Sequence, residues 1–310
     1  MLFGFVNFAN ACLAAALAAL ALPRGIFWLY FSASILLIVG LVKILKSELP
    51  KMRGLDKILP FGRLFFTIPL AVFGTEHFTN TADIAALVPR WIPGHLFWTY
   101  LVGTCLIAAA LSITVEIQSP LAATLLGAMF FSFVCLMDIP GVIAEPGNRF
   151  SWTLALRETA FSAGGLAYAG AHWSSGGRRG VPWLVTIARF FIAIPAVFYG
   201  VEHFPHPMNA PGVPLEKIMP PWIPGRPEWA YLAGIVLVVA GIALLINKKA
   251  QMAATYLGIM ILLLMAFVYL PLLVSSPTSL ESINYFFDTL LFGGAIFVLA
   301  DALRERTAAV

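Results

Sequence analysis

The sequence predicts an all-α, polytopic membrane protein with about ten transmembrane helices. Of its 310 residues, 60% are hydrophobic and 11% are charged, and the mean hydropathy is +0.90. This composition leaves too little polar surface for a soluble domain. The apolar residues come in runs of about 20, the length that a helix needs to cross a hydrocarbon core of roughly 30 Å. Two blocks of sequence also occur twice, which indicates an internal duplication.

The repeated blocks predict two copies of one four-helix unit. Residues 63–78 read RLFFTIPLAVFGTEHF, and residues 189–204 read RFFIAIPAVFYGVEHF. A second block, PRWIPGHLFWTYLVG at 89–103, returns at nearly the same spacing as PPWIPGRPEWAYLAG at 220–234. Near-constant spacing is the signature of a repeated structural unit. Each copy is expected to form a four-helix bundle, and an even number of spans per copy makes the two repeats parallel.

The expected domains follow from these repeats. Residues 1–58 are expected to form a transmembrane hairpin with a basic loop, 59–173 the first repeat, 174–183 a linker and 184–306 the second repeat. Residues 2–22 lack the Lys or Arg that opens a signal peptide, so they are expected to be a span, with a signal anchor as the alternative. The other spans are expected near 26–45, 62–78, 97–115, 119–139, 152–172, 188–204, 229–246, 251–271 and 283–303.

Basic residues predict which way the chain crosses the membrane. The largest positive cluster follows the second span and comprises Lys43, Lys46, Lys51, Arg53 and Lys57. Loops rich in Lys and Arg face the cytoplasm. Ten spans counted from this cluster put the basic pairs at 178–179 and 248–249 on the same side. Both chain termini are therefore expected to be cytoplasmic, with membrane lipid as a direct partner.

Six ionisable residues are the candidates for handling protons or a ligand: Glu76, His77, Glu158, Glu202, His203 and Asp288. Each Glu-His pair ends the first helix of its repeat, and the other two acids lie near the same, outer end of the fourth helix. An ionisable group at membrane depth is costly unless it is paired. Each half is therefore expected to gather one Glu, one His and one acid, and a carboxylate beside an imidazole can pass protons.

A structural role for each Glu-His pair is the alternative, because adjacent helical residues point about 100° apart and cannot both face one partner. Metal binding is disfavoured, because helical bundles bind metals through Glu-x-x-His, and a haem would require His77 and His203 to meet. No metal site and no nucleic-acid partner are predicted. Cys12, Cys105 and Cys135 stand singly, which argues against a disulfide framework or a thiol centre.

Other polar residues in the spans are given lesser roles. Arg63 and Arg189 begin the first helix of their repeats, where a side chain that reaches the membrane surface is the default. Arg157 is expected only to neutralise its neighbour Glu158. Asp138 is not shared by the repeats, because Tyr269 stands in its place.

Aromatic residues and prolines after each Glu-His-Phe triplet predict loops that fold back against the membrane. Tryptophan and tyrosine are enriched at the membrane–water interface, where their amphipathic rings act as anchors. The interface anchors expected here are Trp91, Pro93, Trp98, Tyr100, Trp222, Pro224, Trp229 and Tyr231.

The two blocks together, G-x-E-H-F and then P-x-W-I-P-G-x-x-x-W-x-Y-x-x-G, resemble the DoxX-like family of small four-helix membrane proteins. The chain departs from the usual member in being a tandem fusion with an N-terminal hairpin. The resemblance implies a bacterial or archaeal cytoplasmic membrane, and relatives named DoxD and DoxX are associated with a thiosulfate:quinone oxidoreductase and a terminal quinol oxidase. The matching residues are Arg63, Gly74, His77, Phe78, Trp91, Pro93 and Gly103, then Arg189, Gly200, His203, Phe204, Trp222, Pro224 and Gly234.

The functional expectation is a membrane subunit of a quinone-linked redox complex, in which the Glu-His-acid clusters handle protons or a ligand near the outer face. Quinone is the cofactor that the resemblance implies. The sequence carries no cofactor motif, so electron-carrying groups would belong to other membrane redox subunits, and the chain is not expected to be an enzyme by itself. Two alternatives stay open: a transporter or channel for a small solute, and a scaffold subunit of a larger complex.

Overall fold

The computed structural model describes residues 22–175, 178–210, 212 and 218–308. The span expected at 2–22 lies outside these residues, apart from Leu22. Within the described chain, eight helical segments are long and apolar enough to cross a membrane. The all-α class and the multi-pass membrane character are therefore confirmed.

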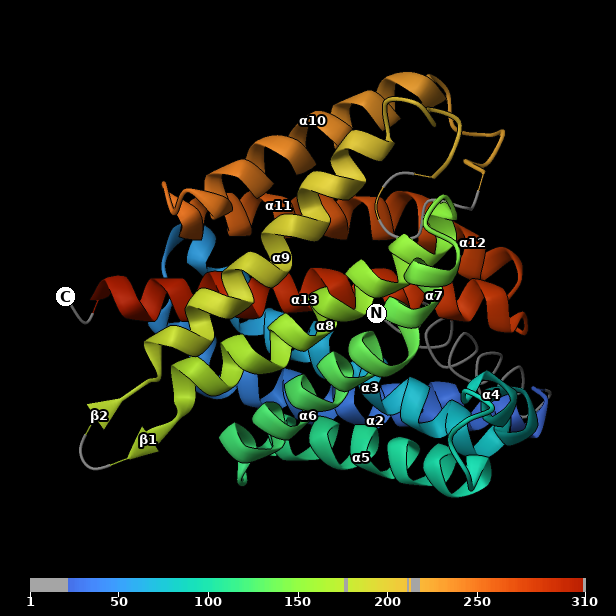
Figure 1. Ribbon diagram of the computed structural model, residues 1–310. Helices are drawn as coiled ribbons and strands as arrows, with labels where there is room; N and C mark the ends of the chain where they lie inside the picture. Colours follow the sequence, from blue (N-terminus) through green and yellow to red (C-terminus); the bar gives the residue numbers. More distant parts are fainter. Residues whose placement is uncertain (1–21, 176–177, 211, 213–217, 309–310) are drawn as a thin grey trace, which may run out of the picture.

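The helices lie close to their expected positions (Figure 1). Before the first repeat come α2 (Arg24–Lys43), a π-helical turn (Ile44–Glu48) and two 3₁₀ turns (Leu49–Lys51 and Gly54–Ile58). The first repeat comprises α3 (Leu59–Thr79), α4 (Thr81–Leu87), α5 (His95–Val115), α6 (Ser119–Phe133), a π-helical turn (Val134–Asp138), α7 (Ile139–Ala144) and α8 (Arg149–His172). A short hairpin of β1 (Ser174–Ser175) and β2 (Arg178–Arg179) follows. The second repeat comprises α9 (Pro182–Glu202), α10 (Arg226–Leu245), α11 (Ala250–Leu264), a π-helical turn (Met265–Tyr269), α12 (Leu270–Ser275) and α13 (Leu280–Ala308).

The span expected at 152–172 is present as α8, but it is not one of the eight apolar helices. It carries Arg149, Arg157 and Glu158 within its first ten residues. Despite these charges, most of its second half is buried against the other helices. A polar helix inside a shell of apolar ones is the arrangement expected for a membrane protein whose functional groups face its interior.

The two repeats match in local detail as well as in helix order. Both third helices contain a π-helical turn at corresponding positions, Val134–Asp138 and Met265–Tyr269. In the loops, the indole N–H of Trp98 donates to the carbonyl of Pro93 at 3.0 Å, and that of Trp229 donates to the carbonyl of Pro224 at 3.1 Å. The two loop contacts have the same sequence cause, because the Trp and the Pro recur in both copies. The π-helical turns share no residue, but a proline follows the last residue of each turn by two positions, at Pro140 and Pro271.

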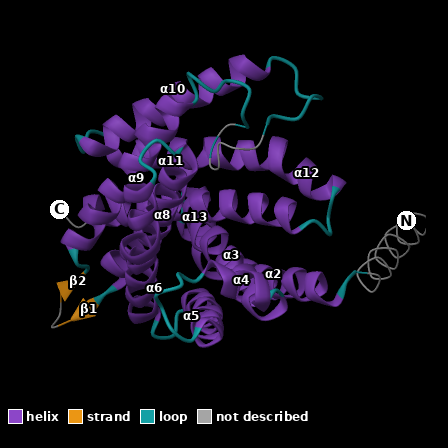
Figure 2. Ribbon diagram, turned by 45° about the vertical axis from the view of Figure 1, so that its right-hand side comes forward, coloured by secondary structure: helices purple, strands orange, loops and turns teal. Residues whose placement is uncertain are grey.

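The repeats interleave, which differs from the expected pair of separate four-helix bundles. The first helix of each repeat packs against the fourth helix of the other: α3 lies against α13, and α9 lies against α8. The two fourth helices also contact each other, so that α8 and α13 lie at the centre of one bundle (Figures 1 and 2). Glycine makes this approach possible, because Phe66 of α3 fits against Gly164 of α8 and Gly294 of α13, where a Cβ atom would collide with it.

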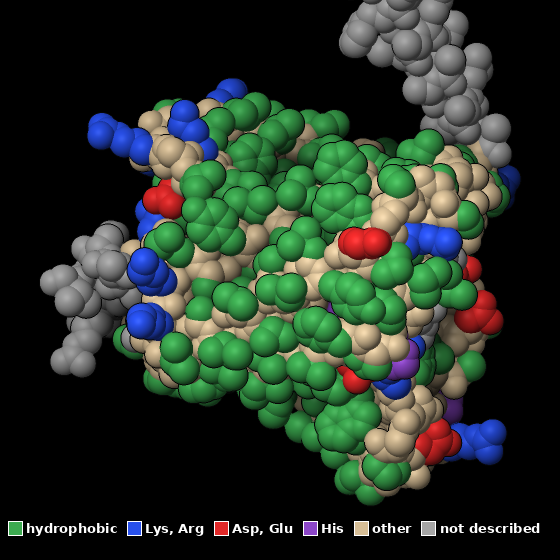
Figure 3. All heavy atoms as spheres, turned by 90° about the horizontal axis from the view of Figure 1, so that it is seen from above, with side chains coloured by type: hydrophobic (Ala, Val, Ile, Leu, Met, Phe, Trp, Pro, Cys, Tyr) green, Lys and Arg blue, Asp and Glu red, His purple; other side chains and the backbone are tan. Residues whose placement is uncertain are grey.

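The two ends of the bundle carry different loops. The basic end carries the segment 44–58 and the turns 116–118 and 246–249, and the long-loop end carries the loops between α3 and α5 and between α9 and α10. Figure 3 shows one face of the molecule, where hydrophobic side chains cover the middle and charged side chains gather toward both ends. The eight expected interface anchors are exposed at the long-loop end, a placement compatible with contact to the membrane surface.

Arg63 is buried at the basic end and does not extend to the membrane surface as the sequence suggested. Only 9% of the residue is exposed, and its guanidinium forms ion pairs with Glu48 and Glu116. Lys43, at the end of α2, also pairs with Glu116 at 2.7 Å. These contacts join α2 to the first repeat. In the second repeat, Arg189 instead donates to the carbonyls of Leu244 and Leu245 at the end of α10.

Candidate functional site: a buried polar cluster between the repeats

The polar residues of the spans converge on one cluster between the repeats, which we call the central cluster. Arg157 and Glu158 belong to α8. Asp288 belongs to α13, as many residues from the start of its helix as Arg157 is from the start of α8. At 1.5 Å per residue, all three side chains stem from backbone about 12 to 14 Å from the long-loop end of their helices. Asp138, the last residue of the first π-helical turn, completes the core of the cluster.

Arg157 and Asp288 form an ion pair that joins the two repeats. Nη1 of Arg157 lies 2.7 Å from Oδ2 of Asp288, and the two side chains are 19% and 13% exposed. The guanidinium also lies 5.9 Å from the ring centre of Phe161, one turn further along α8. Largely removed from water, each charge depends on the other, because an unpaired ion in this environment is costly.

Asp138 and Glu158 bring two carboxyl groups together beside this ion pair. They lie within hydrogen-bonding range of each other. Oδ2 of Asp138 and Oε2 of Glu158 are buried, and no described residue donates a hydrogen bond to either atom. A carboxylate only accepts hydrogen bonds, so a bond between two carboxyl groups requires a proton on one of them. Two carboxyl groups placed in this way can share a proton.

Glu76 extends the central cluster to α3. It is 7% exposed, and Nδ2 of Asn284, on α13, donates to its Oε1 at 3.4 Å. Glu76 is also close enough to Asp288 for the two acids to repel each other. Three of the six residues expected to form the site, Glu76, Glu158 and Asp288, thus lie close together.

Glu202 lies outside the central cluster, so the expectation of one equivalent site in each half is wrong. Its Oε2 is 3.9 Å from Nη1 of Arg149 and 3.6 Å from Nε2 of His206, at the end of α9. The asymmetry has a cause in the sequence. Arg157 has Phe287 as its counterpart in α13, so the matching position of the other central helix carries no cation.

The two histidines expected in the site make structural contacts instead. Nδ1 of His77 bonds to the carbonyl of Phe73 at 2.7 Å, and Nδ1 of His203 bonds to the carbonyl of Tyr199 at 2.5 Å. Nε2 of His203 accepts the backbone N–H of Gly212 at 3.0 Å, which ties the following loop to the helix. These contacts favour a structural role for each histidine at the end of its helix.

His203 should make stability depend on pH. The residue is 1% exposed, and burial lowers the pKa of its imidazole below the ordinary value. A lowered pKa means that the imidazole binds a proton more tightly in the unfolded chain than in the folded one. The stabilisation that neutral His203 provides is therefore complete above about pH 6.5 and is lost as the pH falls. We expect the free energy of unfolding to fall by about 1 kcal/mol through loss of the Gly212 bond. Unfolding measured between about pH 7.5 and 5 should show this loss in His206→Ala but not in His203→Ala; the same slope in both variants would contradict it.

Sequence reasoning missed Asp138 and Asn284 and assigned Arg157 too small a role. Asp138 was set aside because Tyr269 occupies the matching position of the other repeat. One feature of the sequence could have identified Asp138 and Arg157. Every ionisable residue inside a span needs a partner, including a residue that only one repeat carries. Within the described residues, no group of three or more His, Cys, Asp or Glu side chains is placed to hold a metal ion.

Comparisons of the chain with models of known protein families, with curated proteins and with solved structures find no match.

Proposed function

We propose that the central cluster holds and exchanges a proton near the outer face of a bacterial or archaeal cytoplasmic membrane, within a DoxX-like subunit of a quinone-linked redox complex. The observation that carries this proposal is the pair of buried carboxyl groups, Asp138 and Glu158, beside the ion pair of Arg157 and Asp288. A proton held between carboxyl groups inside a membrane bundle is an arrangement typical of proton relays.

The proposed topology places the central cluster on the side where such protons would be released. Lys46, Lys51 and Lys57 lie at the basic end, together with the lysines of the turn 246–249, and loops rich in basic residues face the cytoplasm. Counting 2–22 as a span gives ten spans in two parallel repeats, with both termini cytoplasmic. The long-loop end and the nearby central cluster then face outward.

The chemistry of a quinol fits this placement. Oxidation of a quinol releases protons together with electrons, so a site that works at the outer face needs groups that accept protons there. In the proposed complex, partner subunits carry the electrons, and Glu158 with Asp138 accepts the protons. Arg157 pairs with Asp288 and offers a fixed positive charge beside the exchanging pair.

Replacing Glu158 with Gln tests the proposal in two steps. Infrared difference spectra of the purified chain should show a protonated carboxyl band that Glu158→Gln removes and Glu145→Gln, a change in the exposed loop after α7, leaves intact. Membranes that carry Glu158→Gln should oxidise quinol at least about 100-fold more slowly, the usual contribution of a proton-transferring group. Absence of the band would contradict the shared proton; an intact oxidation rate would contradict the redox role.

A small-solute transporter is the second candidate function, favoured by one observation. The third helices of both repeats are interrupted by π-helical turns at corresponding positions, followed by Pro140 and Pro271. Interrupted helices at matching positions of two repeats are typical of substrate sites in transporters. Proton-driven uptake into vesicles that contain only this chain would favour transport over the redox role.

A further inference from the structure

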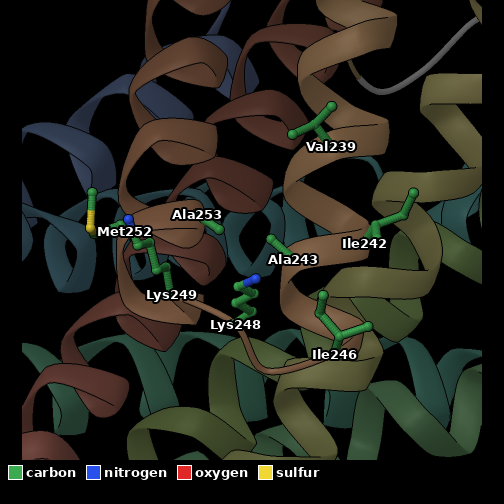
Figure 4. A pocket seen from close by; sticks show the side chains of 8 residues that line it. All are labelled: Val239, Ile242, Ala243, Ile246, Lys248, Lys249, Met252 and Ala253. Carbon is green, nitrogen blue, oxygen red and sulfur yellow. The ribbon is translucent and has the colours of Figure 1, made fainter.

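A groove opens to the surface at the basic end, between α10 and α11 (Figure 4). Its volume is about 490 Å³. Apolar side chains form its walls, and two lysines of the turn between the helices stand at its foot. The residues that matter here are Val239 and Ile242 of α10, Met252 of α11, and Ile246, Lys248 and Lys249 of the turn.

The backbone of the turn fixes both lysines beside the groove. Asn247 and Lys249 adopt left-handed conformations, with φ of 57° and 50°. The N–H of Lys248 donates to the carbonyl of Ala243 at 3.0 Å, which closes the turn onto α10. Neither ammonium group forms an ion pair or hydrogen bond with another described residue. Two adjacent positive charges are thus held next to an apolar surface without a negative partner in the described chain.

The matching turn of the first repeat carries an anion that the turn of the second repeat lacks. Glu116 and Gln118 have the same left-handed conformations, with φ of 61° and 53°. There Glu116 is the anion, and Lys43 and Arg63 pair with it. In the second repeat, Asn247 replaces that carboxylate and Lys248 and Lys249 follow it. The N-terminus of α11, which has no side-chain cap, adds its own positive partial charge.

The apolar walls identify the kind of anion. Val239, on the apolar helix α10, and Ile246, directly after it, are each 62% exposed, so both would contact hydrocarbon in a membrane. A free inorganic anion would satisfy the lysines but not these walls. A phospholipid with a net negative headgroup satisfies both, since basic pockets between transmembrane helices bind such headgroups. We propose that this groove binds one anionic phospholipid, with its headgroup on Lys248 and Lys249 and an acyl chain along α10.

The test measures lipid binding to the purified full-length chain by native mass spectrometry, with phosphatidylglycerol and phosphatidylcholine as probes. Lys248→Gln/Lys249→Gln should weaken binding of one phosphatidylglycerol about tenfold or more and leave phosphatidylcholine unchanged. The matched control, Lys51→Gln/Lys57→Gln, removes the same charge at the same end and should change binding less than about twofold. Equal losses in the two double variants would overturn the proposal.

Three further measurements distinguish a bound lipid from a bound inorganic anion and from a misfolded variant. Ala243→Trp fills the groove without changing charge, and it should also weaken phosphatidylglycerol binding several-fold. Thermal unfolding of each variant in lipid-free detergent identifies any variant that loses binding through misfolding, and Val239→Trp then serves as a second blocking variant. Inorganic phosphate that competes as well as phosphatidylglycerol, at equal concentration, would show a phosphate site and overturn the assignment to lipid.

Discussion

Replacing Arg157 with Met should lower the free energy of unfolding by about 3–5 kcal/mol, because the change leaves the carboxylate of Asp288 buried without its cation. The ion pair is short, at 2.7 Å, and both side chains are largely buried. Glu158 and Asp138 lie close to the same guanidinium, so the variant also removes the only described cation of the central cluster. Unfolding of the wild type and the variant in the same detergent micelle measures the difference.

Two controls separate this effect from a simple loss of charge. Arg149→Met removes a cation from the same helix, but its pair with Glu202 is longer, at 3.9 Å, and lies at the helix end; it should cost less than about 1 kcal/mol. The double variant Arg157→Met/Asp288→Leu should recover most of the lost stability, because replacing a whole buried pair with apolar residues is often neutral. A double variant as unstable as the single one would show that Arg157 acts through packing alone.

The sequence predicted the helices well because their signal is local. The span expected at 97–115 is α5 (His95–Val115), and the span expected at 62–78 is α3 (Leu59–Thr79). Apolar runs and turn residues lie in the same stretch as the helix that they specify, so they can be read without knowing any neighbour.

The sequence predicted how deep in the membrane the residues of the central cluster lie, but not which residues belong to it. Counting residues from the helix ends placed Glu76, Glu158 and Asp288 at one level, and the structure shows them together. Which helices are adjacent is a long-range property, and the repeats suggested the wrong partners. Grouping residues by repeat assumed that each copy encloses its own site, whereas α3 packs on α13 and α9 on α8.

The duplication also drew attention away from Arg157 and Asp138, two residues of the central cluster. Comparing the copies emphasises what they share, and it therefore favoured the two Glu-His pairs, which bond mainly to nearby backbone through their imidazoles. Arg157 and Asp138 have Phe287 and Tyr269 as counterparts, so the comparison discounted them. The central cluster therefore combines acids at a position that both copies share, Glu158 and Asp288, with two residues that only the first copy carries, Arg157 and Asp138.

Changing Gly294 to Ala should lower the free energy of unfolding by about 3 kcal/mol, although alanine is the better helix former. A Cβ atom at this position would lie 2.4 Å from the backbone N of Phe66 and 2.6 Å from the backbone C of Phe65. Backbone cannot rotate away as a side chain can, so α3 must move as a body away from α13. Unfolding in detergent measures the loss, and a larger residue such as Leu should prevent folding.

The neighbouring glycine provides the matched control. At Gly293 a Cβ atom would meet side-chain atoms of Ile261, the nearest at 3.1 Å, which can adjust by a small rotation. Gly293→Ala should therefore change stability by less than about 1 kcal/mol. Equal costs at the two positions would contradict the close contact of α3 with α13. Because Glu76 is on α3 and its partner Asn284 is on α13, Gly294→Ala should also weaken the proton exchange that we propose for the central cluster, whereas Gly293→Ala should leave it unchanged.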